Sequence, residues 1–357
     1  MKHEVPIALA DVTEEWMAAA LSSQRPETPT VISIEHAPVG DDVGLLSTVS
    51  RATLTYATSH SSAPESVIVK IEPAKGVFRT SAEEAHAFSR EIRFYTEVAP
   101  ALPMRVPRYY YGNVSERGGV LVLEDLTHLH QHDQIIGLPN DRVLQAVQEI
   151  AKLHARFWGR EEEPAVSWML RDDDRLWFNV EKNWPLFKEV YSLRLGPEAI
   201  ALAEWLAHNI DTMKSIMAER THTLCHGDFR ADNLLYGEPG SDEQTVVIDW
   251  QLSTLAMGAL DIARLVGGSE PEMERRNHHL EAVGCWHDAL LDHGVRNYAY
   301  EQALQDFRLA AIANLAVPIR LVSAAQSEPG RIGRLVDAMA ERLFASALEI
   351  DASSVLP

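Results

Sequence analysis

At 357 residues, with 46% hydrophobic and 24% charged residues, the chain is typical of a globular protein and is long enough for two lobes. Its formal net charge of −20 argues against binding nucleic acid or an anionic membrane through a broad basic face. The acidity would suit a cationic substrate, or would only keep the protein soluble. Two cysteines are too few for a disulfide framework, the best apolar run is short and ends at Pro318, and the N-terminus turns acidic where an export signal would be apolar. We therefore expect a cytoplasmic protein with no membrane span.

The first third of the chain predicts a small sheet accompanied by one long helix. Its predicted elements, in chain order, are a capped helix over 13–23, strands over 31–39, 47–58 and 66–73, a helix over 81–98, and strands over 107–114 and 118–126. Glu84 follows Ser81 at the spacing of a capping box, which marks the start of the long helix. We expect this lobe to comprise residues 1–126.

From residue 127 onward the pattern is mostly helical. Residues 141–158 carry an apolar helical stripe, and the segment from about 161 to 220 and the tail from 264 also read as helices. The predicted fold class is therefore α+β, with a small antiparallel-sheet lobe over 1–126 and a larger, mostly helical lobe over 127–357.

Two acids and one amide lie among apolar residues in the stretch HGDFRADNLLYGEPGSDEQTVVIDWQ. LLY and TVVID, joined by a turn-rich segment, predict a hairpin in which Leu234 pairs near Ile248 and Asn233 lies beside Asp249. Asp228, five residues before Asn233, is free to approach the same point. Because amide and carboxylate oxygens are ligands that Mg²⁺ accepts, the hairpin predicts a cation site.

A further unusual acid is Glu91, which borders the apolar face of its helix. It lies three residues after Phe88 and four before Tyr95, both on the apolar stripe. A half-buried carboxylate needs a partner, and Lys70 on the preceding strand is the obvious one. A lysine held in this way can be fixed against phosphate oxygens.

Together these segments resemble the aminoglycoside phosphotransferase and choline kinase family, whose members are small-molecule kinases with the bilobal protein-kinase fold. HGDFRADN is similar to the catalytic-loop pattern H-x-D-x-x-x-x-N, and Asp249 in VIDWQ takes the place of the D-F-G aspartate. Lys70 in VIVK and Glu91 in REIRFY resemble the strand lysine and its helix partner, and LVLEDL resembles the hinge. The tail LLDHGVRNYAYEQALQDFR is similar to the ecdysteroid-kinase-like branch.

The resemblance implies a role for each matched residue. Asp228 would orient, and help to deprotonate, the substrate hydroxyl, and Arg230 would steady the γ-phosphate. Asn233 and Asp249 would hold Mg²⁺, while Lys70, held by Glu91, would contact the α- and β-phosphates of ATP.

The nucleotide contacts depart from the protein-kinase pattern at two places. GDDVGLLS is not a G-x-G-x-x-G loop, so phosphate contacts are expected from backbone amides between Gly44 and Ser47. Backbone groups of about Glu124 and Leu126 would meet adenine. Trp250 and Gln251 follow Asp249 in place of the D-F-G glycine, so switching of the activation-loop kind is not expected.

The sequence thus predicts an ATP-dependent phosphotransferase acting on a hydroxylated small molecule such as an aminoglycoside, a sugar, a sterol or a hydroxyacyl metabolite. The alternatives are a nucleotide-binding pseudokinase, which should have lost catalytic residues, and a metal-dependent hydrolase built on His226. The oligomeric state stays open. If the acceptor were a coenzyme A thioester, its binding would require a basic patch. The candidate residues are Arg264, Arg275, Arg276, Arg320, Arg331 and Arg334.

Several polar residues also have plainer interpretations. His226 is expected to brace the catalytic loop, His154 to be a satisfied core histidine, and Asp261 to anchor the catalytic loop or cap a helix. A transition-metal site is the less favoured interpretation of the alternating histidines in THLHQHD, His128, His130 and His132.

Overall fold

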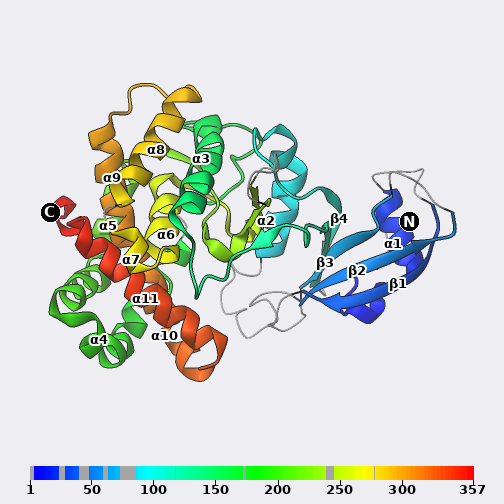
Figure 1. Ribbon diagram of the computed structural model, residues 1–357, viewed down its shortest axis with the longest axis horizontal. Coiled ribbons are helices and arrows are strands. Elements are labelled where there is room, and N and C mark those ends of the chain that lie inside the picture. The colour runs from blue at the N-terminus through cyan, green and yellow to red at the C-terminus, as the bar shows by residue number, and fades with distance from the viewer. Residues whose placement is uncertain are drawn as a thin grey trace. The chain divides into compact units, whose positions relative to one another are not determined.

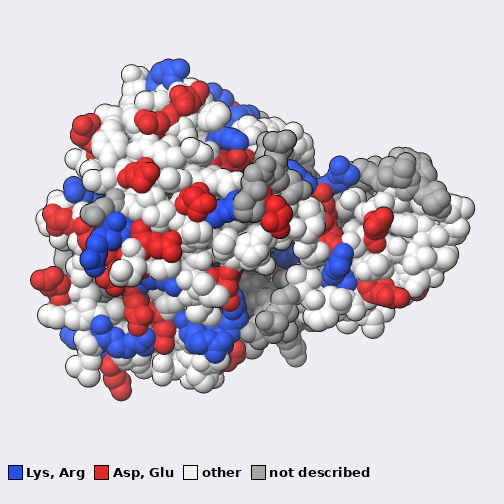
Figure 2. All heavy atoms as spheres, viewed as in Figure 1, with Lys and Arg blue, Asp and Glu red and all other residues white. Residues whose placement is uncertain are grey.

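The computed structural model describes residues 4–23, 29–39, 48–58, 63–72, 86–116, 118–171, 174–238, 245–276 and 278–357. The chain forms two compact units. The first comprises Met1–Pro100, Val106–Leu129 and Ile248–Gln251; the second comprises Ala101–Arg105, His130–Val247 and Leu252–Pro357. Lysine and arginine side chains are interspersed with aspartate and glutamate over the face shown in Figure 2. The expected boundary between a nucleotide-binding lobe, 1–126, and a catalytic lobe, 127–357, stays a prediction.

A five-stranded antiparallel sheet forms the centre of the first unit (Figure 1). Its order is β1-β2-β3-β5-β4, with bounds β1 Val31–Pro38, β2 Thr48–Tyr56, β3 Ser66–Ile71, β5 Gly118–Glu124 and β4 Tyr109–Ser115. Four of them lie within the predicted segments, and β4 extends one residue beyond its predicted end, to Ser115. The helix α1, Glu14–Ser22, begins after Thr13, whose hydroxyl oxygen accepts a hydrogen bond from the Trp16 backbone N–H at 3.2 Å.

The alternation of β3 decides where Lys70 points. Val67, Val69 and Ile71 belong to the apolar cluster that α1 completes with Met17 and Leu21. Because neighbouring residues of a strand face opposite sides of the sheet, Lys70 faces away from this cluster.

The helix α2, Ala87–Arg93, packs against β4 and β5 and continues through a π-helical turn, Phe94–Val98. These residues confirm the later part of the helix predicted over 81–98. Ser81 and Glu84, its predicted capping box, lie outside the described residues.

The second unit is mostly helical, as predicted. Its elements are β6 His130–Gln131, α3 Asn140–Phe157, α4 Val180–His208, α5 Ile210–Ala218, β7 His222–Cys225, β8 Leu234–Tyr236, β9 Val246–Val247, β10 Thr254–Met257, α6 Ala259–Ser269, α7 Glu272–Arg275, α8 His278–Asp292, α9 Tyr300–Asn314, α10 Ala316–Ser327 and α11 Arg331–Glu349. The helix α4 is kinked at Gly196, where φ is +80°. Nearly every residue of α6 is buried, and the helix packs against α9 and α11 (Figure 1). A helix buried on all sides is the core of its unit.

The predicted hairpin forms, with a register one residue away from the predicted one. Leu234 pairs with Val247 and not with Ile248, and β9 ends at Val247. The strand cannot continue to Asp249, because Asp249 has a φ of +67°, in the left-handed region that extended strands do not use. The predicted position of Asn233 beside Asp249 stays a prediction.

The apolar segment that was expected to end at Pro318 is longer than predicted. The stretch Tyr300–Ser327 is long and apolar enough to cross a membrane, with a mean hydropathy of 1.4 over an 18-residue window, of which 72% is buried inside the protein. Pro318 lies in the first turn of α10, where a helix tolerates proline. Such burial is typical of a core helix.

Candidate active site

In the first unit, Lys70 lies between two carboxylates. Its Nζ donates to Glu91 Oε1 at 2.9 Å, to Glu91 Oε2 at 2.7 Å and to Asp249 Oδ1 at 2.9 Å. Glu91 is fully buried, and these hydrogen bonds confirm the predicted contact between Glu91 and Lys70. Burial alone would lower the pKa of Lys70, but Asp249 and Glu91 outweigh it and raise that pKa well above its usual value. Lys70 is therefore a fixed cation.

The segment that carries Asp249 is fastened to α2 and its π-helical turn at three points. Trp250 is fully buried and stacks on Phe94, with ring centroids 4.0 Å apart and planes 9° from parallel. Arg90 Nη1 donates to the Gln251 carbonyl oxygen at 2.7 Å, and the Trp250 backbone N–H reaches Glu91. Trp250 and Gln251 thus fix the backbone on the carboxyl side of Asp249.

In the second unit, Asp228 has an arginine on each carboxylate oxygen; it belongs to residues 226–233, which we call the catalytic loop after the motif that they resemble. Arg230 Nε donates to Oδ2 at 2.9 Å, and Arg264 Nη2 donates to Oδ1 at 2.9 Å. Burial alone would raise the pKa of Asp228, but the two guanidinium groups hold that pKa far below its usual range. Asn233 Nδ2 donates to the Asp228 carbonyl oxygen at 2.8 Å and, more distantly, to Oδ2 at 3.3 Å. The loop therefore brings together Asp228, Arg230 and Asn233, as the motif predicts.

The backbone of the catalytic loop is anchored by Asp261 on α6. Asp261 Oδ2 accepts from the His226 backbone N–H at 2.6 Å, and Oδ1 accepts from the Gly227 backbone N–H at 3.0 Å. His226 Nδ1 in turn accepts from the Asp228 backbone N–H at 3.2 Å. These bonds confirm the predicted bracing role of His226 and the anchoring role of Asp261. Gly227 is required here: its φ is +83°, and a Cβ atom would lie 2.2 Å from the Leu252 carbonyl oxygen.

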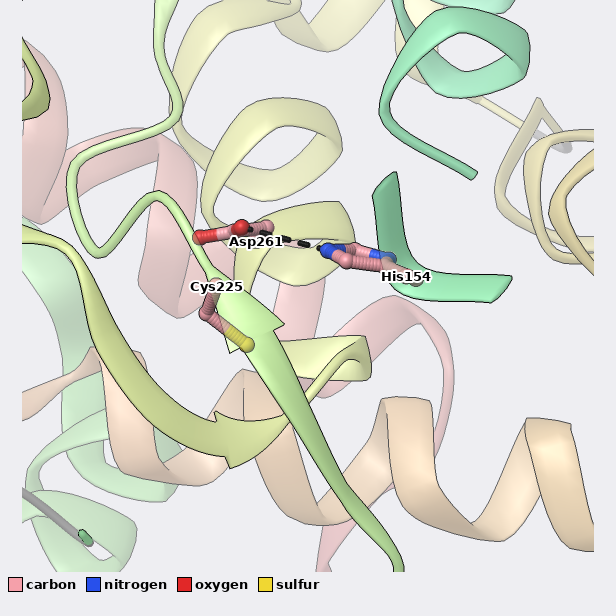
Figure 3. A group of neighbouring side chains, drawn as sticks. All are labelled: His154, Cys225 and Asp261. Atoms are coloured by element: carbon pink, nitrogen blue, oxygen red, sulfur yellow. Dashed lines mark hydrogen bonds and ion pairs between the residues drawn. The ribbon is translucent and has the colours of Figure 1, made fainter. Parts of the chain in front are cut away.

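Among the described residues, one group of three side chains has metal-ligand chemistry: His154, Cys225 and Asp261 (Figure 3). Trp286 Nε1 donates to His154 Nδ1 at 3.1 Å, so the proton of the neutral ring is on Nε2, which donates to Asp261 Oδ2 at 3.3 Å. Both ring nitrogens are therefore used by hydrogen bonds. His154 thus supports Asp261 and is the satisfied core histidine that the sequence predicts, while Cys225 Sγ contacts the Ala256 and Met257 carbonyl oxygens at 3.5 Å.

Arg264 is the residue of the site whose contact sequence reasoning missed, since it appeared only among six candidate arginines of a basic patch. Arg264 pairs with Asp228, Arg275 with Glu349 and Arg331 with Asp133. The available signal was spacing: Arg264 follows Asp261 by three residues on one helix, so a helix that anchors the loop with Asp261 presents Arg264 on the same face.

Three further sets of predicted site residues are those of the phosphate loop, the adenine contacts and the alternating histidines. Gly44 and Ser47 lie outside the described residues. The Glu124 backbone N–H donates to the Arg108 carbonyl oxygen at 2.8 Å, and the adenine contacts expected of Glu124 and Leu126 stay a prediction. His130 and His132 lie with ring centroids 4.4 Å apart. Neither belongs to a group of three metal-ligand side chains among the described residues.

Residues 51–293 match the model of the phosphotransferase enzyme family, APH. The chain belongs to this family. The match includes Lys70, Glu91, Asp228, Asn233 and Asp249. The predicted family resemblance is thereby confirmed.

Solved structures of other phosphotransferases have a similar fold. The microcompartment-associated aminopropanol kinase is 14% identical and covers 96% of this chain and 99% of its own, with a TM-score of 0.54. The GDP complex of aminoglycoside 2′-phosphotransferase-IIIa is 14% identical and covers 94% and 99%, with a TM-score of 0.52. Ethanolamine kinase of Plasmodium vivax is 14% identical and covers 90% and 84%, with a TM-score of 0.52. These likenesses confirm the predicted kinase-like fold.

A curated relative shares a short segment at higher identity. The plant protein named "Probable acyl-CoA dehydrogenase IBR3", of Arabidopsis thaliana, is 43% identical over 68 residues. These residues are 19% of this chain and 8% of that protein. The match thus spans a small part of the relative's length.

Proposed function

We propose that the protein is a Mg²⁺- and ATP-dependent kinase that transfers the γ-phosphate to a hydroxyl group of a small molecule. The observation that carries the proposal is Lys70 fixed between Glu91 and Asp249, beside a family match that also includes the catalytic loop. A lysine so placed is the cation that phosphotransferases of this fold direct at the nucleotide phosphates.

The donor set fits a magnesium nucleotide. Asp249 and Asn233 offer the oxygen ligands that Mg²⁺ takes, and Lys70 offers a fixed ammonium group. When bound, Mg·ATP supplies the phosphoryl group and neutralises the charge that develops on it. We assign the metal to Asn233 and Asp249, the phosphates to Lys70, and adenine to backbone groups of Glu124 and Leu126.

On the acceptor side, Asp228 orients the substrate hydroxyl. Since Arg230 and Arg264 hold its pKa far below the usual range, Asp228 remains a carboxylate and accepts a hydrogen bond, but it is a weak base. Arg230 is held by Asp228 and Asp232, so it can present a cation to the transferred group without leaving the loop. Substrate positioning and electrostatic stabilisation, more than proton abstraction by Asp228, then account for the acceleration of phosphoryl transfer.

The pseudokinase alternative is not favoured, because Lys70, Glu91, Asp228, Asn233 and Asp249 are all present. The hydrolase alternative loses its main ligand, since His226 Nδ1 accepts a hydrogen bond inside the loop. The named structural relatives act on aminoglycosides, ethanolamine and aminopropanol, which all carry a hydroxyl group. The acceptor class proposed for this chain is accordingly a small alcohol, from the aminoglycoside, sugar, sterol and hydroxyacyl classes.

A thermal-shift titration with ATP plus Mg²⁺, run beside ATP plus EDTA, tests the proposal. Ligand at 100 times its Kd should add about 2.7 kcal/mol of stability, and only in the magnesium arm. Asp249→Asn should abolish the magnesium-dependent rise. Asp228→Asn should keep that rise and lower turnover by about two orders of magnitude or more. No stabilisation of the wild type by any nucleotide would refute the kinase assignment.

A further inference from the structure

Six charged side chains of the second unit form a row of alternating sign that runs through Asp228. We call this row the ion chain; its members, in order, are Arg264, Asp228, Arg230, Asp232, Arg331 and Asp133. The Arg264–Asp228 and Asp228–Arg230 distances are both 2.9 Å, Arg230 pairs with Asp232, and the last two distances are 3.5 and 2.7 Å. Every interior member therefore has an opposite charge on both sides.

The two ends of the ion chain differ. Asp133 is 35% exposed in its side chain and also accepts the Ile135 backbone N–H at 2.7 Å, so water and backbone satisfy it. The Arg264 side chain is only 9% exposed. Its Nη1 atom is shielded from solvent and has no hydrogen-bond partner among the described residues. The ion chain thus ends, at Arg264, in a buried donor without an acceptor among the described residues.

A buried guanidinium with one carboxylate contact is incompletely compensated. Burial lowers the pKa of Arg264 although the carboxylate of Asp228 opposes this. Buried donors of native proteins are as a rule hydrogen-bonded, and an exception calls for an explanation such as a bound ion or ligand. The missing partner of Nη1 is an acceptor, and next to a guanidinium the strongest acceptor is an oxyanion.

The position of that oxyanion follows from the guanidinium itself. Nη1 and Nη2 belong to one rigid planar fork, and Nη2 is bound to Asp228 Oδ1. An oxygen held by Nη1 therefore lies beside the carboxylate that orients the substrate hydroxyl.

We propose that Arg264 is an oxyanion-binding residue of the site: its Nη1 donates to a ligand oxyanion that continues the ion chain beyond Arg264. The inference rests on the proposed function and deepens it. The oxyanion has two possible sources, the phosphoryl group in transfer or a carboxylate carried by the acceptor. An acceptor of the second kind is a hydroxycarboxylate, not a purely cationic amino alcohol.

Two substitutions separate this role from that of a counterion. Arg264→Lys keeps a cation for Asp228 but presents no second nitrogen of the fork, and Arg264→Gln removes the cation as well. Arg331→Lys is the matched control, because Arg331 belongs to the ion chain but contacts Asp232 and Asp133, not Asp228.

Calorimetric titrations with Mg·ADP and with a non-hydrolysable Mg·ATP analogue form the first arm. If the phosphoryl group is the source, both Arg264 variants should lose about 10-fold or more of the preference for the analogue over ADP, as for a charge-assisted hydrogen bond. Their affinity for ADP and the behaviour of Arg331→Lys should be unchanged.

The second arm measures ADP formation with 3-hydroxybutyrate and with 1,3-butanediol, which lacks the carboxylate. If the acceptor is the source, the wild type prefers the acid and both Arg264 variants lose that preference, with the analogue-to-ADP ratio unchanged. Arg264→Lys that matches the wild type in both arms would show a counterion only and overturn the inference. A wild type that binds no nucleotide would instead refute the proposed function, and this inference with it.

Discussion

At the scale of single residues, Asp261 determines the backbone of the catalytic loop. Its two oxygens accept different backbone N–H groups, those of His226 and Gly227, and Oδ2 also accepts His154 Nε2. A buried carboxylate that receives several N–H bonds has its oxygens satisfied by hydrogen bonds. The residue that holds Asp228 in place thus never needs to touch a substrate.

Asp261→Asn should separate positioning from binding. The amide has one acceptor oxygen, so one of the two loop N–H groups would face an NH₂ group. We expect a loss of about 1–3 kcal/mol in the free energy of unfolding and a lower kcat, with the Kd of Mg·ADP unchanged. Urea unfolding and steady-state kinetics measure the two effects. Wild-type kcat in a well-folded variant would contradict the anchoring role.

Sequence reasoning recovered the residues of this site unevenly. The Lys70–Glu91 pair could be predicted because Glu91 borders an apolar helical stripe and Lys70 lies on a neighbouring strand, so a local pattern marks both. The Arg264–Asp228 contact joins residues 36 positions apart. The three-residue spacing of Asp261 and Arg264 puts both on one face of α6, but only the tertiary placement of α6 beside the loop brings Arg264 to Asp228.

At the scale of elements, the segment Ile248–Gln251 leads into a 3-10 turn, Trp250–Leu252, and is held by packing and not by a strand. Its strand neighbour β9 ends at Val247, and Asp249 adopts a left-handed backbone conformation. Trp250, stacked on Phe94, is the largest side chain in the segment and is fully buried. Packing of an aromatic side chain therefore replaces the flexible glycine of the D-F-G pattern.

Trp250→Ala should destabilise the first unit strongly. Removal of a buried tryptophan leaves a cavity and is expected to lower the free energy of unfolding by about 3–5 kcal/mol. Because the same segment carries Asp249, the magnesium-dependent stabilisation by nucleotide should fall as well. Trp250→Phe, which keeps an aromatic ring over Phe94, should lose less of both in denaturant titrations. An unchanged nucleotide response in Trp250→Ala would show that Asp249 is positioned by other contacts.

Length explains which elements the sequence pattern could and could not predict. The five strands of the large sheet have six to nine residues, and all five were predicted, even β5, in which six of seven residues are buried. The strands β7 and β10 were not predicted, because four buried residues are too short a run to distinguish a strand from other buried segments. Along the chain, β7 directly precedes the catalytic loop and β10 follows the Asp249 segment.

At the scale of the whole molecule, a lower pH should reduce the free energy of unfolding through a buried histidine of the helical unit. His279 on α8 is 3% exposed and shares a hydrogen bond with Ser346 on α11 at 2.8 Å. Burial lowers its pKa to about 4, and the nearby Glu349 opposes the shift. The folded protein therefore holds this imidazole neutral while the unfolded chain can protonate it.

His279→Gln should flatten the pH dependence of stability. Between about pH 6.5, the pKa of an unperturbed histidine, and about pH 4, the unfolded state binds the proton and the native state does not, so stability falls as pH falls, by up to about 1.4 kcal/mol per pH unit. Urea unfolding at several pH values measures this slope. The exposed His293→Gln serves as the control. A slope as steep in His279→Gln as in the wild type would show that other groups carry the effect.

The assignment of Ile248–Gln251 to the first unit, between flanks that belong to the second, has a consequence for recombination. A chimaera that takes residues 1–129 from a relative would keep the original Asp249 and Trp250, and these would have to accept a foreign lysine and a foreign aromatic ring in place of Lys70 and Phe94. A crossover placed at the border between the units would therefore break contacts within the first. Functional hybrids of this family should be those in which residues 248–251 are inherited together with the N-terminal segment.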